Sequence, residues 1–319
     1  MNGRMICVLG GSGFVGRHFA CGLAGDGWRV RVPTRRRERK RDLLVVPAVE
    51  LIEADVHDPA VLDRVFAGCD TAVNLIGILN ETGDDGRGFH RAHVELTEKV
   101  VAACRRQGVR RYLHMSALNA GDSGPSFYLR SKGLAENLAH AAAGGGLTVT
   151  SFRPSVIFGA EDRFLNLFAG LLRVAPILPL ACPGARFAPV YVGDVARAFI
   201  RSIDDPATAG RRYDLCGPSI HTFRALVDYV NRLTGAHRPV LPLPDVLARL
   251  QANVMEHLPG KPFSRDNLRS LGVDSVCNAG AGLAALGITP TPIEAVAPLY
   301  LGGSGTRSRY DGYRAAGRT

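Results

Sequence analysis

The sequence lacks any uninterrupted apolar run of the length that a membrane-spanning helix needs, which is about 18 residues or more. Its most apolar stretch, residues 164–182, is broken by Asn166, Arg173, Pro176 and Pro179. A signal peptide is not indicated either, because the short apolar run near the N-terminus ends in glycines and reads as a strand. We therefore expect a chain without a transmembrane helix or a secretion signal.

Cysteine is sparse and scattered, and no C-x-x-C pair occurs that would indicate a metal site or a redox motif. An odd number of unclustered cysteines favours free thiols in a reducing compartment, where most would fill space in the core. The sequence thus predicts no metal site. The seven residues are Cys7, Cys21, Cys69, Cys104, Cys182, Cys216 and Cys277.

Aromatic residues make up only 7% of the chain, and no RRM-like or helix-turn-helix signature is present. The formal net charge of +10 is therefore a weak argument for nucleic-acid binding, and we expect no nucleic-acid partner. Much of the basic excess lies in one run, residues 35–41. A peripheral attraction to an anionic lipid surface fits this charge better.

Short β-branched runs alternate with helical patterns over the first two-thirds of the chain, which is typical of a parallel sheet flanked by helices. The pattern predicts an α/β fold with a doubly wound, Rossmann-type parallel sheet. Strands are expected at residues 5–9, 29–33, 50–54, 71–76, 111–116, 148–153 and 188–192. Helices are expected at residues 15–25, 59–67, 89–107, 128–143 and 165–174, with Gly144, Gly145 and Gly146 ending the fourth.

After residue 216 the pattern changes to short helices separated by prolines. Thr222 is expected to cap a helix that runs to residue 233, and Asp245 to cap another that runs to 258. We expect a nucleotide-binding domain at residues 1–155 and about 187–215. Residues 156–186 and 216–319 would form a smaller, mostly helical substrate-side domain, with a poorly ordered tail from 302.

A glycine-rich turn directly follows the first predicted strand. Gly10, Gly13 and Gly16 satisfy G-x-x-G-x-x-G, and Gly11, Gly13 and Gly16 satisfy G-x-G-x-x-G. Glycine allows the tight turn and lets backbone amides approach a pyrophosphate, while the helix that follows directs its positive end at this charge. The turn therefore predicts a dinucleotide site that includes Phe14 and Val15.

The end of the second predicted strand favours NADP(H) over NAD(H). A site for NAD usually places Asp or Glu here, whereas this strand continues into Thr34 and Arg35 with no carboxylate before Glu38. A guanidinium suits the 2′-phosphate of NADP(H) because it donates two parallel charge-assisted hydrogen bonds. A solvated basic loop is the alternative interpretation.

Further cofactor contacts are expected where later strands end. Asp55 and Val56 follow the third strand, where the adenine of the cofactor is expected. The end of the fourth strand is expected to pass close to the cofactor ribose. The residues expected along this second segment are Leu75, Ile76 and Gly77.

Tyr128 and Lys132 form a Y-x-x-x-K pair whose spacing puts both side chains on one helix face. Chance predicts only about 0.1 such pairs, given the eight tyrosines and four lysines. A lysine ammonium next to a phenol favours the phenolate, so Tyr128 is expected to exchange a proton near neutral pH, and Ser116 would hydrogen-bond a substrate oxygen. These three residues are the expected catalytic set and are also expected to contact the cofactor, although a pair that only binds cofactor remains an alternative.

Together these residues resemble the extended or atypical branch of the short-chain dehydrogenase/reductase superfamily, whose members include NAD-dependent epimerases and dehydratases. Residues 153–159 look like its R-P-x-x-x-x-G segment, in which Pro154 and Ile157 would pass the nicotinamide. With the E-D-R-F-L-N stretch at 161–166, P-V-Y-V-G-D-V at 189–195 and L-G-I-T-P-T-P at 286–292, the chain is similar to the NADPH-binding accessory subunits of respiratory complex I and their bacterial homologues.

This resemblance implies tightly held NADPH and an accessory or assembly role at complex I, close to ubiquinone or another lipid ligand. Because no mitochondrial targeting extension precedes Met5, we expect a protein of the bacterial cytoplasm, with peripheral contact with the inner membrane as a further expectation. The retained Ser116, Tyr128 and Lys132 leave an active NADP(H)-dependent oxidoreductase, or an epimerase or dehydratase, as the alternative function. A sensor that reports the NADPH/NADP ratio to a protein partner is a third possible function.

Overall fold

The computed structural model describes residues 4–278 and 282–302. The chain folds as two compact units, each built from several segments. The first unit comprises Met1–Pro154, Val192–Leu215 and Cys277–Thr289, and the second comprises Ser155–Tyr191, Cys216–Val276 and Pro290–Thr319.

A parallel sheet of seven strands forms the centre of the first unit within the described residues. Its order is β11-β6-β5-β4-β1-β2-β3, and every neighbouring pair is parallel. This order reverses between β1 and β4, as in a doubly wound Rossmann sheet, so the predicted fold class is confirmed. The strands are β1 (Met5–Leu9), β2 (Arg29–Thr34), β3 (Val49–Glu53), β4 (Thr71–Asn74), β5 (Arg111–Met115), β6 (Thr148–Pro154) and β11 (Arg212–Leu215).

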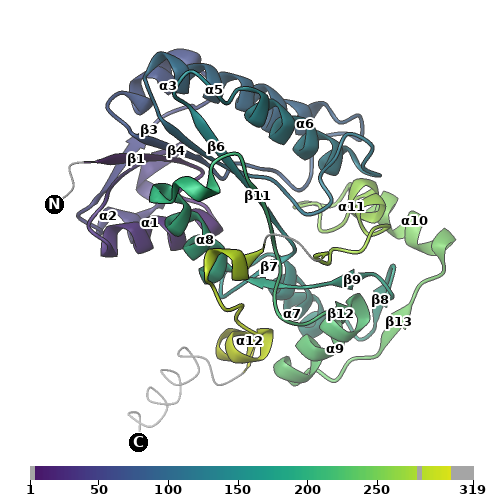
Figure 1. The fold of residues 1–319 in the computed structure, drawn as a ribbon. Helices are drawn as coiled ribbons and strands as arrows, with labels where there is room; N and C mark the ends of the chain where they lie inside the picture. Colours follow the sequence, from purple (N-terminus) through teal and green to yellow (C-terminus); the bar gives the residue numbers. More distant parts are fainter. Residues whose placement is uncertain (1–3, 279–281, 303–319) are drawn as a thin grey trace, which may run out of the picture. The chain divides into compact units, whose positions relative to one another are not determined.

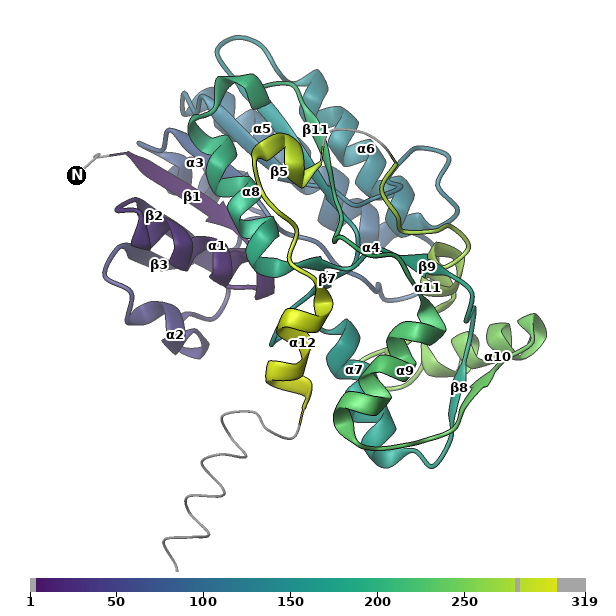
Figure 2. The same cartoon turned by 60° about the horizontal axis from the view of Figure 1, so that its bottom comes forward.

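Helices cover both faces of this sheet (Figure 1). One face carries α1 (Phe14–Gly25), which packs on α8 (Val192–Asp204). The other face carries α3 (Pro59–Phe66), α5 (Leu96–Arg106) and α6 (Phe127–Ala141). Figure 2 shows the short η4 (Leu283–Leu286) returning beside α8 and β11 from far along the sequence. Three other short helices are η1 (Arg37–Arg39), α2 (Arg41–Leu44) and η3 (Pro206–Thr208).

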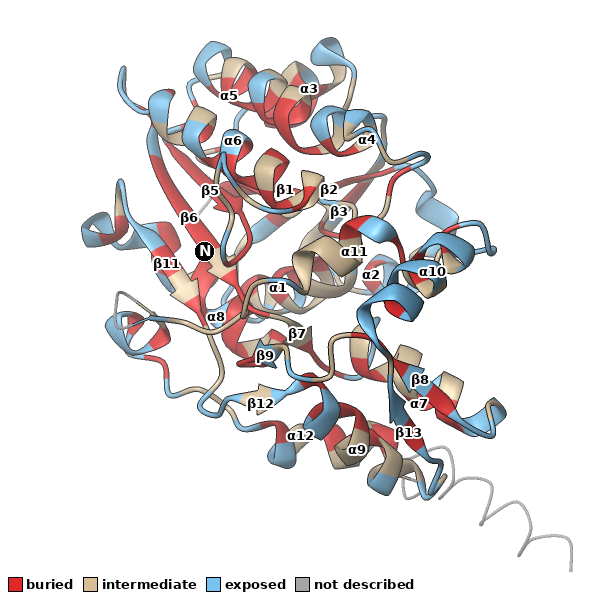
Figure 3. Cartoon of the chain, turned by 90° about the vertical axis from the view of Figure 1, so that its right-hand side faces the viewer, coloured by how far each residue is buried: buried red, intermediate tan, exposed pale blue. Residues whose placement is uncertain are grey.

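The strands of the sheet are mostly buried, as the red ribbons of Figure 3 show. Because helices cover both faces, β1 is apolar throughout rather than alternating. The core between the sheet and α3, α5 and α6 contains Leu9, Phe66 and Tyr112, all fully buried.

Local sequence signals set several helix ends. Asp58 caps α3 by accepting from the Ala60 amide at 2.9 Å, and Ser126 caps α6 by accepting from the Leu129 amide at 3.1 Å. After α6, Gly144, Gly145 and Gly146 all have positive φ, as expected for glycines that end a helix. The helix predicted at residues 89–107 begins earlier, with α4 (Arg87–Phe89), and passes through a π-helical segment, η2 (His90–Glu95), into α5.

The second unit consists mainly of helices around a cluster of phenylalanine rings. Phe164 and Phe168 of α7 (Phe164–Val174) pack against Phe223 of α9 (Phe223–Thr234), which Thr222 caps as predicted. The unit also contains α10 (Asp245–Met255), α11 (Arg265–Ser270) and α12 (Ile293–Leu301). Its short strands pair as β7 (Ile157–Phe158) with β10 (Val190–Tyr191), β8 (Leu178–Leu180) with β13 (Val240–Pro242), and β9 (Arg186–Phe187) with β12 (His221–Thr222).

Three expectations from the sequence are wrong. The strand expected at residues 188–192 contributes only β10, outside the large sheet, and β11 takes the seventh place because its backbone continues the ladder on β6. Pro244, not Asp245, is the N-cap residue of α10. Cys216 and Cys277 are disulfide-bonded, whereas all cysteines were expected to be free thiols.

The expected disorder of the tail concerns residues that lie, from 303 onward, outside the described part of the chain. In the part that the structure describes, no helix has both the length and the apolar character to cross a bilayer.

Candidate functional site

The glycine-rich turn connects β1 to α1 and is packed too closely for side chains. A Cβ on Gly16 would lie 2.3 Å from the Gly10 carbonyl oxygen, far inside any normal contact. Gly10 has a φ of +76°, a conformation that residues with a Cβ rarely adopt. A Cβ on Gly11 would lie 2.9 Å from the Val32 side chain of β2. The backbone of the turn therefore requires glycine at these positions.

The amino end of α1 leaves its first amides without a side-chain cap. The N-cap residue is Gly13, and within the described residues no side chain hydrogen-bonds to this end. Phe14, Val15 and Gly16 are the first three residues of α1, where amides lack partners within the helix. The turn thus presents amide donors and the positive end of a 12-residue helix together.

The end of β2 lies next to this turn. Thr34 is buried at the last position of β2, and its Oγ1 lies 3.2 Å from Ser12 Oγ of the turn. Arg35 follows with an exposed side chain, and no ion pair within residues 4–278 and 282–302 involves its guanidinium. The first arginine after β2 therefore extends from the strand end that contacts the turn.

The two residues predicted to contact the cofactor after β3 differ in exposure. Asp55 is exposed, and its Oδ1 accepts from the His57 amide at 3.0 Å, which closes a local turn. Val56 is partly buried and packs against the core of the first unit. One oxygen of the Asp55 carboxylate thus already accepts a hydrogen bond from the backbone.

The segment after β4 runs directly beside the glycine turn. The Leu75 amide donates to the Leu9 carbonyl at 2.9 Å, and the Asn74 side chain accepts from the Ile76 amide at 3.1 Å. A Cβ on Gly77 would lie 3.0 Å from Lys132 Nζ. The structure therefore brings this segment, the glycine turn and the lysine together where the strand order reverses, the usual place for a ligand in such sheets.

Lys132 is buried on α6, and its Nζ donates to the Met115 carbonyl at the end of β5, at 3.0 Å. Burial lowers the pKa of Lys132 to about 8, although the Glu136 carboxylate acts in the opposite direction. The ammonium is thus held in one position, between the end of β5 and Gly77.

Tyr128 lies one helical turn before Lys132, with its ring against two other rings. The Phe89 and His93 ring centroids lie 6.0 and 5.7 Å from it, both in edge-to-face arrangements. Burial raises the pKa of Tyr128 to about 12, so the phenol is protonated at neutral pH. The expectation that the lysine favours a phenolate near neutral pH is therefore wrong, because burial keeps the phenol protonated, as a proton donor rather than a base.

Ser116, the third residue of the expected catalytic set, directs its hydroxyl toward a carboxylate. Its Oγ donates to Glu136 Oε2 at 2.7 Å, and Glu136 is almost fully buried on α6. The guanidinium groups of Arg153 and Arg212 lie 2.9 and 3.1 Å from Glu136 Oε1. The Ser116 proton is thus committed to an anchored carboxylate.

Two residues of this site were missed by the sequence analysis, Glu136 and His93. Glu136 lies four residues after Lys132, so helical spacing was a signal that could have identified it. His93 contacts both Ser131 and the Ile78 amide from within a π-helical segment, which no pattern in the sequence indicated.

The last two predicted contacts fall in different units. Pro154 ends β6 in the first unit, and its carbonyl accepts from the Leu118 amide at 3.1 Å. Ile157 belongs to β7 in the second unit, where it pairs with Val190.

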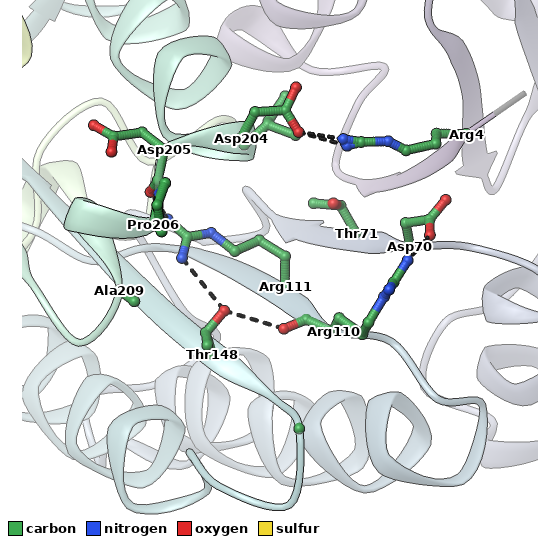
Figure 4. Close-up of a pocket in the computed structure, with 12 residues that line it drawn as sticks. Arg4, Asp70, Thr71, Arg110, Arg111, Thr148, Asp204, Asp205, Pro206 and Ala209 are labelled. Atoms are coloured by element: carbon green, nitrogen blue, oxygen red, sulfur yellow. Dashed lines mark hydrogen bonds and ion pairs between the residues drawn. The ribbon is translucent and has the colours of Figure 1, made fainter. Parts of the chain in front are cut away.

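A cavity of about 500 Å³ lies at the opposite edge of the sheet, at the amino ends of β4, β5 and β6. Figure 4 shows Arg4 directed at Asp204 and Arg110 lying beside Asp70. Arg4 donates to Asp204 at 2.6 Å, Arg110 donates to Asp70 at 2.7 Å, and Arg111 donates to the Ser202 carbonyl at 2.7 Å. Arg4 and Arg110 are thus paired with aspartates, and Arg111 is held by a backbone carbonyl, so all three guanidinium groups already have partners in the protein.

Comparison with known proteins gives relatives of two kinds. Subunit 9 of the 1 alpha subcomplex of mitochondrial NADH dehydrogenase (ubiquinone) from Arabidopsis thaliana is 31% identical over 288 residues, which are 86% of this chain and 69% of that protein. Ceramide reductase from Caulobacter vibrioides is 29% identical over 245 residues, 76% of this chain and 74% of that protein.

Among solved structures, UDP-glucose 4-epimerase from Thermotoga maritima has the same fold. Its TM-score is 0.74 at 16% identity, covering 93% of this chain and 97% of that one. A family model described as the NAD dependent epimerase/dehydratase family matches residues 6–216, from β1 to the end of β11. With this match and a glycine turn at the reversal of a doubly wound sheet, the chain belongs to the NAD dependent epimerase/dehydratase family.

Proposed function

We propose that this protein binds NADP(H) in its first unit and retains the nucleotide as part of an accessory or assembly role at a quinone-reducing complex of the complex I type. The turn fits a dinucleotide, because glycine at Gly10, Gly11 and Gly16 lets the backbone turn more tightly than any Cβ would allow and so leads directly into the amino end of α1. The uncapped amides at Phe14 to Gly16 supply donors for the pyrophosphate.

The exposed Arg35 supports the phosphorylated coenzyme. It directly follows Thr34, whose hydroxyl reaches the glycine turn, so its guanidinium is within reach of the adenosine side of a nucleotide bound there. A guanidinium pairs well with a phosphate and has no use for the neutral 2′-hydroxyl of NAD.

The observation that favours retention over turnover is the hydrogen bond from Ser116 to Glu136, 2.7 Å long. Ser116 would have to donate its proton to a substrate carbonyl to assist reduction. Here the carboxylate that accepts this hydrogen bond is buried and anchored by two arginines, so breaking the bond would cost a buried, charge-assisted hydrogen bond. Lys132 keeps a position suited to holding the nicotinamide ribose, one helical turn from Tyr128.

The membrane-associated setting is inferred from the relatives. The mitochondrial subunits that align with most of this chain carry the name of NADH dehydrogenase (ubiquinone). The net charge of +10 is compatible with peripheral contact with anionic lipid.

Mass spectrometry of the nucleotide released by acid from the purified protein tests this function. We expect NADP(H) in near-stoichiometric amount, and no oxidation of NADPH when the protein is mixed with short-chain ubiquinones or ketones. Native electrophoresis of detergent-solubilised membranes should place the chain with the quinone-reducing complex. Absence of any pyridine nucleotide, together with no calorimetric binding of NADPH, would refute the proposal.

A second candidate function is the reduction of a ketone on a lipid-like substrate. The observation that favours it is the pairing of Tyr128 with Lys132 on one face of α6, with the phenol protonated at neutral pH. A bound reduced nicotinamide supplies the hydride for such a reaction. Tyr128 would then donate its proton to the carbonyl oxygen, and Lys132 would hold the ribose. Consumption of NADPH with a long-chain ketone would select this function.

A further inference from the structure

His93 lies in an unusual part of its helix. The helical stretch from Arg87 to Arg106 is interrupted by the π-helical segment η2, and His93 is its fourth residue. A π-helical turn rotates the side chains that follow it relative to a regular α-helix and often occurs at functional sites. Here it accompanies a histidine that is only 3% exposed and directed at α6.

The hydrogen bonds of His93 fix its tautomer. The Ile78 amide donates to Nε2 at 3.2 Å, so this nitrogen carries no proton. Burial and the nearby Lys132 ammonium hold the pKa of His93 well below its usual range, so the ring is neutral. The proton must then be on Nδ1, which lies 2.8 Å from Ser131 Oγ.

The same chain of donors continues to Tyr128. The Ser131 hydroxyl donates to the Tyr128 carbonyl at 2.9 Å, and the His93 ring stands edge-to-face against the Tyr128 ring. A directed series thus runs from the Ile78 amide through His93 and Ser131 to the backbone of Tyr128.

The other side of the ring faces the segment after β4. A Cβ on Gly77 would lie 3.5 Å from His93 Nε2 and 3.0 Å from Lys132 Nζ. His93 therefore holds the backbone at Gly77 and Ile78 beside the lysine ammonium while it also supports the helix that carries the tyrosine. Without the ring, the segment after β4, the π-helical segment η2 and helix α6 would lose the hydrogen bonds that connect them.

We propose that His93 is a positioning residue for the nicotinamide half of the bound nucleotide, acting through the Gly77–Ile78 backbone and Tyr128. This inference depends on the proposed nucleotide function of the first unit. It assigns the adenosine half to other residues, namely the glycine turn and Arg35, and so predicts that the two halves respond differently to changes at position 93.

Two substitutions separate the roles of the two ring nitrogens. The amide of His93→Gln reaches the position of Nε2 and keeps an acceptor for the Ile78 amide. The amide of His93→Asn stops at the position of Nδ1 and keeps only the donor to Ser131. We expect NADPH affinity to fall about threefold in His93→Gln, which loses the bond to Ser131, and about tenfold in His93→Asn, which loses the bond from the Ile78 amide.

Calorimetry with NADPH and with 2′,5′-ADP, which lacks the nicotinamide half, provides the decisive comparison. In both variants we expect the affinity for 2′,5′-ADP to equal that of the wild type. The matched control is His140→Gln, because His140 on the last turn of α6 hydrogen-bonds to Ser151 Oγ at 2.9 Å, away from the site. This control should change neither affinity.

Ser131→Ala covers the case in which His93→Asn does not fold. It removes the partner of Nδ1 while leaving the ring in place, and should weaken NADPH about threefold without weakening 2′,5′-ADP. The positioning role is overturned if a variant loses affinity for NADPH and for 2′,5′-ADP equally. It is also overturned if Ser131→Ala, or a folded His93→Asn, keeps the wild-type affinity for NADPH. If the wild type binds neither ligand, the proposed function itself has failed, which is a separate result.

Discussion

The Ser116 hydroxyl donates to Glu136 Oε2 at 2.7 Å, and this bond connects the end of β5 to the middle of α6. The acceptor is a buried carboxylate whose charge is balanced by Arg153 and Arg212. Glu136 of α6 thus connects residues from β6 and β11 with the residue that follows β5. The same carboxylate lies one turn from Lys132 and favours the charged form of this lysine.

Glu136→Gln should be strongly destabilising. It removes a buried charge that pairs with Arg153 and Arg212 and leaves Arg153 only the Asp214 carboxylate at 3.9 Å, so we expect the free energy of unfolding to fall by about 3 kcal/mol. Urea denaturation at neutral pH measures this change. The control is Asp63→Asn, whose carboxylate pairs with the half-exposed Arg106 at 2.9 Å and should cost less than about 1 kcal/mol. Similar losses for both variants would contradict the role given to Glu136.

Gly16→Ala should abolish nucleotide binding. The added Cβ would lie 2.3 Å from the Gly10 carbonyl, so the turn must open and its amides must lose their common direction. We expect NADPH affinity to fall more than about tenfold and stability to fall by about 1–3 kcal/mol. Gly25→Ala on the same helix has no atom within 4 Å of the new Cβ and should leave affinity unchanged. Calorimetry of both variants tests the turn, and an unaffected Gly16→Ala would exclude it as the binding element.

Arg35→Ala should weaken NADPH about tenfold or more and leave NADH within about twofold, since only NADPH carries the 2′-phosphate. The measurement is fluorescence titration of both coenzymes. Arg39→Ala, in the same exposed basic run, is the control for a general loss of positive charge. Equal weakening of NADPH and NADH by Arg35→Ala would assign the arginine to the pyrophosphate or to the fold.

Lys132 should give the free energy of unfolding a characteristic dependence on pH. Its pKa is about 8 in the folded chain, below the ordinary value of 10.5, so the unfolded chain binds more protons between these values. Stability from this group therefore rises as the pH rises through that window, by as much as about 3 kcal/mol. Below pH 8 the penalty of the buried ammonium is present in full.

Lys132→Met removes this dependence. We expect the difference in the free energy of unfolding between wild type and Lys132→Met to shift in favour of the wild type from pH 7 to pH 10. Urea denaturation at several pH values in this range measures the difference. A difference that does not change with pH would show that the ammonium is not desolvated in the folded chain.

Tyr128→Phe separates retention of the nucleotide from turnover. If the protein retains its nucleotide, the variant should bind NADPH within about twofold of the wild type, because only a hydroxyl is lost. Both proteins should then oxidise NADPH at the background rate with quinones and ketones. A wild type that reduces a ketone at least about a hundredfold faster than Tyr128→Phe would establish the reductase function instead.

Much of the first unit was predictable because its signals are local. Met5 to Leu9 form a continuous apolar run, and the glycines that follow can only be a tight turn, so the first strand and helix were confirmed nearly to the residue. The strand at 212–215 was missed because Arg212 and Asp214 interrupt its apolar pattern. Its place in the sheet depends on pairing with β6, which is distant in sequence.

The sequence by itself determined the glycine turn, the arginine that follows β2 and the spacing of Tyr128 and Lys132, because each depends on residues only a few positions apart. Only the tertiary structure decided how the site residues are used. The Ser116 hydroxyl donates to Glu136, and His93 reaches Ile78 and Ser131. These contacts join segments that are 15 to 38 residues apart, and their geometry follows from how β4, β5 and α6 pack, which no local pattern encodes.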